Sequence, residues 1–198
     1  MFQKKNNELK IAVCGGGGVG KTTLLKSFKK GHFVGDVSIT TEVEYHIVHL
    51  NLIKEKEHLF LVFWDFGGQR QFQDMEIKDI TKFIEHAQQA DAIMLCFDLN
   101  DLDTLEEVSE WVKLLPVDIP RILVGTKKDL GGSMADLIEL YLETFKFQSY
   151  IETSAKTDIT SVNRVFEELL IVMLAFKREK AHRIIQNYNN SLSLLWRA

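Results

Sequence analysis

The 198-residue sequence contains little cysteine or proline and carries little net charge. Its two cysteines, Cys14 and Cys96, each lie in an apolar run typical of a buried strand, so we expect reduced core thiols rather than a disulfide. The formal charge of −4 argues against nucleic acid as a partner. No apolar run has a clean membrane-spanning length, and the start is polar. We therefore expect a cytoplasmic protein, with peripheral contact to a membrane left open.

Strands and helices are predicted to alternate along the chain. Short apolar runs predict strands at residues 9–14, 43–52, 58–64, 92–97, 120–124 and 150–152. Apolar residues at helical spacing predict helices at 21–30, in a stretch ending near 90, at 104–115, at 133–145, and over a final long segment that includes 162–173. This alternation predicts an α/β fold with an open, six-stranded, mostly parallel sheet, one antiparallel edge strand and helices on both faces. Its site should lie at the carboxyl ends of the strands.

The loop after the first predicted strand carries a phosphate-binding pattern. Residues 15–22 match G-x-x-x-x-G-K-[ST] between a strand and a helix, as that pattern requires. Glycines let backbone N–H groups turn toward phosphate, Lys21 can reach the β and γ oxygens, and Thr22 offers a hydroxyl to Mg²⁺. The residues predicted to bind the nucleotide here are Gly15, Gly18, Val19, Gly20, Lys21, Thr22 and Thr23.

The loop after the third predicted strand supplies candidates for metal binding and hydrolysis. Asp65 ends this strand, where an acidic residue can hold Mg²⁺ through its waters. Gly68 completes a D-x-x-G pattern with Asp65 and is predicted to contact the γ-phosphate. Gln69 follows, and its side chain is our candidate for positioning the attacking water.

The base must be identified elsewhere, because P-loops serve ATPases, kinases and GTPases alike. Thr126, Lys127 and Asp129 follow the fifth predicted strand and fit an N/T-K-x-D guanine pattern. A carboxylate at Asp129 can accept from both the ring N–H and the exocyclic amine of guanine, whereas adenine offers no matching pair of donors. After the sixth strand, the segment predicted to contact the guanine oxygen is Ser154, Ala155 and Lys156.

Taken in order, these four patterns resemble the Ras superfamily of small GTPases over about residues 8–181. The resemblance implies a P-loop NTPase of the Ras-like G-domain type, which binds GTP and GDP with Mg²⁺ and acts as a molecular switch. It also implies that Phe33 packs over the guanine and that Thr40 binds Mg²⁺ and senses the γ-phosphate. Catalysis would then depend on Lys21, Thr40 and Gln69, and the metal on Thr22, Thr40 and Asp65. Residues 40–45 look like the Rab version of this segment and 64–69 more like Arf proteins, so the subfamily stays open.

Several positions depart from the family pattern. Thr126 replaces the commoner Asn, so we expect fewer side-chain bonds between the loops, and Val37 stands where many members have a tyrosine. No arginine occurs between Phe33 and Thr40, which predicts slow intrinsic hydrolysis and the need for a GTPase-activating protein, unless Arg70 beside Gln69 contributes. An exchange factor and effectors are further expected partners. A binding module that holds GTP but rarely hydrolyses it stays an alternative, and Asp129 argues against a P-loop enzyme that uses ATP.

Three further features bear on partners. Residues 70–91 are longer than the family usually has, which indicates either an enlarged switch II surface or a longer helix. We divide the chain into a GTPase domain at 1–181 and a tail at 182–198, which is expected to dock or fray more readily than to bind a partner or membrane. It contains no cysteine for prenylation, and Phe2 stands where myristoylation needs glycine.

We expect a monomer. His46 and His49 should lie on opposite faces of a strand and form no metal site.

Overall fold

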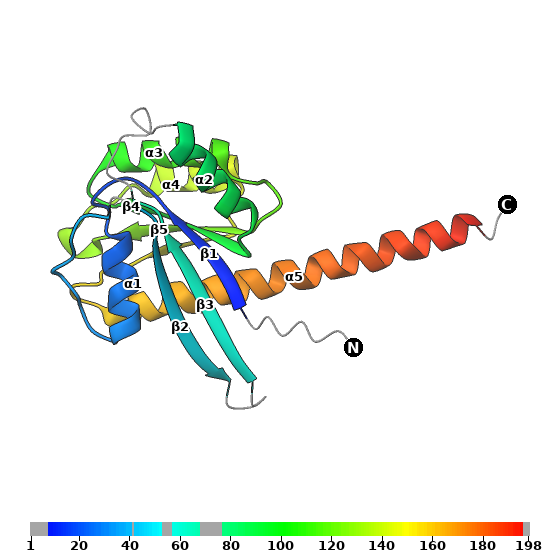
Figure 1. Ribbon diagram of the computed structural model, residues 1–198. Coiled ribbons are helices and arrows are strands. Elements are labelled where there is room, and N and C mark those ends of the chain that lie inside the picture. The colour runs from blue at the N-terminus through cyan, green and yellow to red at the C-terminus, as the bar shows by residue number, and fades with distance from the viewer. Residues whose placement is uncertain (1–7, 41, 53–56, 68–76, 196–198) are drawn as a thin grey trace.

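The computed structural model describes residues 8–40, 42–52, 57–67 and 77–195 (Figure 1). Strands and helices alternate along the chain as the sequence predicted. The strands are β1 (Glu8–Cys14), β2 (Glu44–Leu52), β3 (Glu57–Asp65), β4 (Ala92–Asp98), β5 (Arg121–Thr126) and β6 (Ser149–Glu152). The helices are α1 (Lys21–Lys30), α2 (Ile77–Gln88), α3 (Leu102–Leu114), the 3-10 helix η2 (Lys128–Leu130), α4 (Ala135–Phe145) and α5 (Ile159–Leu195).

The strands form one six-stranded sheet in the order β2-β3-β1-β4-β5-β6. β2 pairs with β3 in antiparallel register, and every other neighbouring pair is parallel. The predicted mostly parallel sheet with one antiparallel edge strand is therefore confirmed. Because β1, β3, β4, β5 and β6 run in the same direction, the loops that follow them meet at one edge of the sheet.

Helices cover both faces of the sheet, as predicted. One apolar cluster joins the sheet to α1 and α5, where Phe28 and Phe166 stack with ring centroids 3.7 Å apart. A second cluster joins the other face to α2, α3 and α4, with Phe83 edge-on to Trp111. Cys14 and Cys96 are free thiols in these two clusters, which confirms the predicted reduced core thiols. Burial raises the pKa of Cys96 to about 12.

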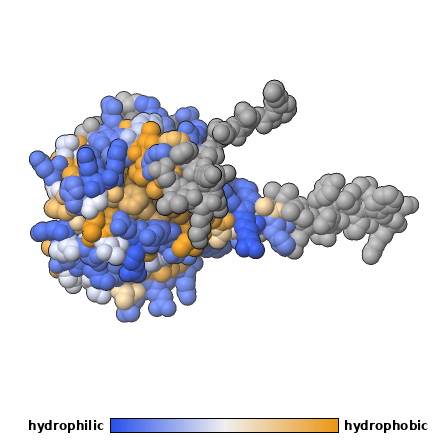
Figure 2. All heavy atoms as spheres, turned by 90° about the horizontal axis from the view of Figure 1, so that it is seen from below, coloured by the Kyte–Doolittle hydropathy of each residue, from blue (hydrophilic) through white to orange (hydrophobic). Residues whose placement is uncertain are grey.

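Helix α5 continues beyond the sheet as a single helix of 37 residues. The sequence predicted a tail that docks on the domain or frays. Docking is wrong for residues 182–195, because α5 passes through this segment and points away from the body (Figure 1). Figure 2, seen from below, shows the body and the first part of this projection leaving it. No helix in the described part of the chain is both long enough and apolar enough to span a bilayer.

Candidate functional site

The loops after β1, β5 and β6 enclose a pocket of about 270 Å³, closed on one side by the segment that follows α1. Ten residues predicted to bind the nucleotide line it: Gly18, Val19, Gly20, Thr23, Phe33, Thr126, Lys127, Asp129, Ala155 and Lys156. Leu24, Gly35, Leu130 and Thr153 complete the lining and were not predicted. A pocket lined by glycine backbone and apolar side chains, with a few polar groups among them, is of the kind that binds small molecules.

The glycine-rich loop turns tightly between β1 and α1. Gly15 has a φ of 136°, and a Cβ at that position would lie 2.0 Å from the Cys96 carbonyl oxygen, so only glycine fits. Lys21 begins α1 and donates from Nζ to the carbonyl oxygens of Gly15 and Gly16 at 2.8 and 2.7 Å. Burial lowers the pKa of Lys21, and nearby Asp65 opposes that shift. The loop therefore holds a buried cation beside the free N–H groups at the start of α1.

Three predicted metal ligands from three segments converge beside Lys21. The hydroxyl of Thr22 donates to Asp65 Oδ2 at 2.5 Å and lies 2.9 Å from the hydroxyl oxygen of Thr40. Thr40 is buried and Asp65 is fully so. Asp65 Oδ1 has no hydrogen-bond partner within the described part of the chain. An all-oxygen donor set with an unsatisfied buried carboxylate oxygen fits Mg²⁺, a hard cation that binds oxygen ligands and water.

His46 lies next to this cluster, although the sequence indicated only a polar strand residue. Its Nε2 is 3.6 Å from both Asp65 Oδ2 and Glu44 Oε2 and has no hydrogen-bond partner among the described residues. His46 is buried and His49 is exposed, which confirms that the two lie on opposite faces of β2. The antiparallel register places His46 opposite Phe63, two residues before Asp65. This register could not be read from the spacing of the two histidines.

The predicted base-binding residues come from the loops after β5 and β6. Ser154 donates from its hydroxyl to Asp129 Oδ1 at 2.6 Å, which orients the carboxylate at the pocket. The hydroxyl of Thr126 lies 2.5 Å from the carbonyl oxygen of Val19 and 2.9 Å from that of Phe97. Thr126 thus still ties the end of β5 to the phosphate loop, although one hydroxyl can donate to only one of these carbonyls at a time.

A polar network at the end of β4 supports Lys127 and was missed by the sequence reasoning. Asp98 pairs with Lys127 Nζ at 2.7 Å and accepts from the side chain of Asn100 at 3.0 Å. Asn100 also donates to the Lys127 carbonyl and accepts from the Gly132 N–H. Burial alone would raise the pKa of Asp98, but the hydrogen bonds from Lys127 and Asn100 outweigh it and lower that pKa. The only signal in the sequence is a polar Asp-Leu-Asn directly after a buried strand.

Phe33 lies at the rim of the pocket with 42% of its surface exposed. A Cβ on Gly35 would come within 2.6 Å of its ring, so the glycine leaves room for the ring to lie there. The described residues do not include Gly68, Gln69 or residues 70–76, the first part of the long segment at 70–91. The predicted roles of these residues stay predictions.

Comparison with known proteins places the chain among small GTP-binding proteins. The model of the Ras family matches residues 10–175. Ras-related protein Rab-7b of Bos taurus is 30% identical over 198 residues, covering 95% of this chain and 91% of that protein. Ras-related protein RabH of Dictyostelium discoideum is 26% identical over 193 residues, and the match covers 94% of this chain and 92% of that protein. Ras-related protein Rab-9B of Homo sapiens is 28% identical over 186 residues, and the match covers 88% of this chain and 87% of that protein.

Proposed function

Because the chain belongs to the Ras family and is similar to Rab proteins, we propose that it is a switch that binds GTP and GDP and hydrolyses GTP slowly. The observation that supports this most directly is the convergence of Lys21, the Thr22–Thr40–Asp65 cluster and Asp129 around one edge of the sheet. Lys21 lies where it could contact the phosphates, and Asp129 where it could select guanine.

Each residue has a proposed role in that cycle. Thr22, Thr40 and Asp65 would hold Mg²⁺, which would neutralise charge on the β- and γ-phosphates. The amides at the start of α1 and Lys21 would bind the phosphates, and Gly68 the γ-phosphate. Gln69 would position the attacking water. Phe33 would cover the base, with Asp129 and the loop of Ser154, Ala155 and Lys156 along its edge.

Regulation by other proteins follows from the same proposal. Among the described residues, no arginine lines the pocket. An arginine supplied by an activating protein can raise hydrolysis by about 10³- to 10⁵-fold. We therefore propose an activating protein, an exchange factor and effectors as partners, and a cytoplasmic protein in which any membrane contact is peripheral.

Single-turnover hydrolysis tests the enzymatic part of the proposal. Purified protein loaded with GTP and Mg²⁺ should form GDP slowly, and the Gln69→Leu variant should form it more slowly still at unchanged GTP affinity. GTP that persists equally in both proteins would instead support a binding module that does not hydrolyse its nucleotide.

Base selection is tested separately. Asp129→Ala should weaken GDP binding by about a hundredfold, because two charge-assisted hydrogen bonds of about 1.5 kcal/mol each are lost. Asp129 is exposed, so the fold should survive. ATP that competed as well as GTP for the unaltered protein would reject a guanine site.

A further inference from the structure

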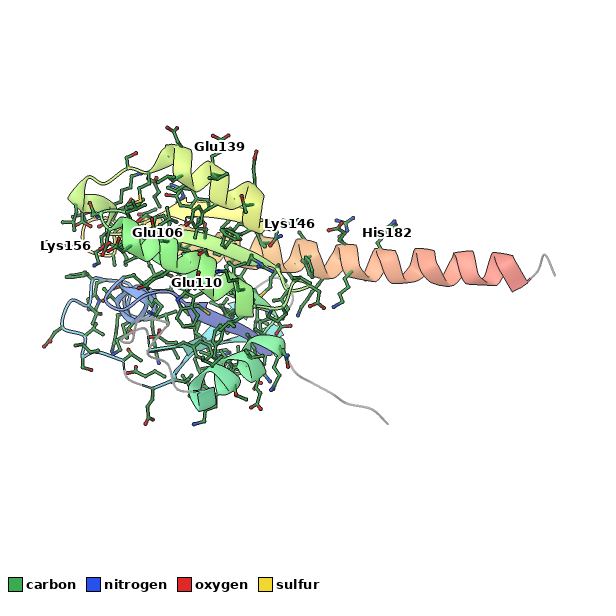
Figure 3. All side chains as sticks on the ribbon, turned by 90° about the horizontal axis from the view of Figure 1, so that it is seen from above. Glu106, Glu110, Glu139, Lys146, Lys156 and His182 are labelled. Atoms are coloured by element: carbon green, nitrogen blue, oxygen red, sulfur yellow. The ribbon has the colours of Figure 1, made fainter. Side chains whose placement is uncertain are left out.

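Helix α5 extends far beyond the part that packs on the sheet. Its 37 residues correspond to a length of about 55 Å. The apolar core cluster includes α5 residues only as far as Met173. Figure 3 shows His182 on the projecting part of α5 and Lys156, which lines the nucleotide pocket, at the opposite end of the body. A partner could therefore bind the projecting part without covering the nucleotide.

The sequence of α5 carries a heptad repeat from Ile171 onward. Starting at Ile171, residues spaced alternately by three and four positions run through the whole extension. These a and d positions are Ile171, Leu174, Arg178, Ala181, Ile185, Tyr188, Leu192 and Leu195. Seven of the eight are apolar or aromatic, and a single charged residue stands at one a position. A hydrophobic period of 3.5 residues is the pattern of a left-handed coiled coil.

The described side chains show that this stripe starts on the side of α5 away from the sheet. Ile171 and Leu174 have 60% and 61% of their surface exposed, whereas Val172 and Met173 between them are buried in the core cluster. Arg178 and Ala181, which continue the stripe, are exposed as well. The apolar stripe is thus separate from the face that packs on the sheet, and it is available along its described length.

The extension also has little intrinsic reason to be helical. Residues 186–193 include Asn187, Asn189 and Asn190, together with two serines, all weak helix formers. In proteins, most helical stability comes from packing of an amphipathic face rather than from intrinsic propensity. A helix of this composition that continues to Leu195 therefore calls for packing along its apolar stripe.

We propose that α5 pairs with α5 of a second copy of this chain in an antiparallel coiled coil. In that register, Ile171 lies opposite Leu195, Leu174 opposite Leu192, and Ala181 opposite Ile185 of the other copy. Arg178 then lies opposite Tyr188, where a guanidinium can stack on an aromatic ring. A parallel pairing would place two Arg178 residues in one layer beside Lys177, which is unfavourable. The stripe is therefore complementary to itself when one helix is reversed.

A membrane surface fits the same helix less well. Lys177 pairs with Asp91 at 2.7 Å and Lys180 lies 3.8 Å from Asp118, so both cations have acidic partners on the body. Residues 184–196 contain no lysine or arginine, although basic residues on the polar face give interfacial helices their attraction to anionic lipid.

Sedimentation velocity of the full chain tests the pairing. The wild type should sediment as a dimer in both the GDP-bound and the GTP-analogue-bound form. Ile185→Asp places a charge in the stripe and should weaken the dimer by about a hundredfold or more. Asn190→Asp adds the same charge at an f position, off the stripe, and should leave the dimer intact. Unchanged GDP affinity in both variants would show that the body is folded.

Disulfide trapping tests the direction of pairing, since Cys14 and Cys96 are both buried. Leu174→Cys combined with Leu192→Cys should cross-link two chains on oxidation, because these positions face each other in the antiparallel register. Leu192→Cys alone should not cross-link, and its doing so would overturn that register in favour of a parallel one.

Two outcomes would overturn the pairing itself. The first is that the wild-type protein stays monomeric at concentrations of tens of micromolar. This outcome counts against the pairing also if the monomer floats with vesicles of phosphatidylserine and phosphatidylcholine. The second is a dimer that Ile185→Asp and Asn190→Asp weaken equally.

Discussion

At the scale of single residues, Gly16 in the phosphate loop lies close to the carboxylate of Glu107. A Cβ on Gly16 would lie 2.3 Å from Glu107 Oε2, and burial raises the pKa of this glutamate. Gly16→Ala should therefore destabilise the protein by no more than about 1 kcal/mol, the lower limit for overpacking, because the contact is with the end of a flexible side chain that can move aside. Urea unfolding in excess GDP measures the effect.

The matched control for Gly16→Ala is the same substitution in a Glu107→Ala background. If contact with the carboxylate is the cause, Gly16→Ala should cost almost no stability in the Glu107→Ala background. The coupling free energy between positions 16 and 107 would then lie within the range of about 0.5–3 kcal/mol seen for contacting residues. Equal costs in both backgrounds would show that Glu107 does not limit position 16.

At the scale of elements, the ends of β4 and β5 are held together by charge. The pKa of Asp98 is lowered in the folded protein, despite its burial, by hydrogen bonds from Lys127 and Asn100. A carboxyl whose folded pKa lies below the unfolded value of about 3.9 adds stability that is fully present above that value and is lost as pH falls through the folded pKa. Between about pH 5 and pH 2, the wild type should therefore lose stability more steeply than Asp98→Asn.

Thermal unfolding of both proteins across that pH range measures the difference. Asp136→Asn is a suitable control, because Asp136 is an exposed residue at the start of α4 with no part in this network. Identical pH profiles for wild type and Asp98→Asn would show that the network contributes nothing to folding.

Some helices, strands and contacts could be predicted from the sequence, and others could not. β1 and the phosphate loop were predictable because the apolar run, the glycines and Lys21 are adjacent in the chain. α3 begins at Leu102 rather than at 104, because Asp101 caps it by accepting from the Asp103 N–H, a local signal that was overlooked. The Asp98–Asn100–Lys127 bonds and the position of His46 depend on strand pairing, so no spacing could indicate them.

The length of α5 was missed for a different reason. Its core-facing stripe includes Val165, Leu169 and Met173, whereas its outer stripe contains Ile171 and Leu174. Two apolar stripes on different sides of one helix give no single period, so the sequence did not indicate where the helix ends beyond Met173. The boundary at 181 follows the extent of the resemblance to the Ras superfamily and stays a prediction.

At the scale of the whole molecule, folding and nucleotide binding should be linked. The pocket residues come from loops after β1, β5 and β6, which the chain brings together only in the folded sheet. A ligand that binds only the folded state stabilises it by about 2.7 kcal/mol when its concentration is a hundred times its Kd. For a chain of this size, GDP with Mg²⁺ at that concentration should raise Tm by about 5–10 °C.

Removing the metal and altering the base site should reduce this shift in different ways. Chelating Mg²⁺ with EDTA should reduce the shift for GDP, because the Thr22–Thr40–Asp65 oxygens then lose the cation they are proposed to share with the phosphates. Asp129→Ala, at the same GDP concentration, should show almost no shift with or without EDTA. ATP should shift the Tm of neither protein. A full GDP shift in Asp129→Ala would mean that the nucleotide is held by its phosphates alone, and that the base loops contribute no affinity.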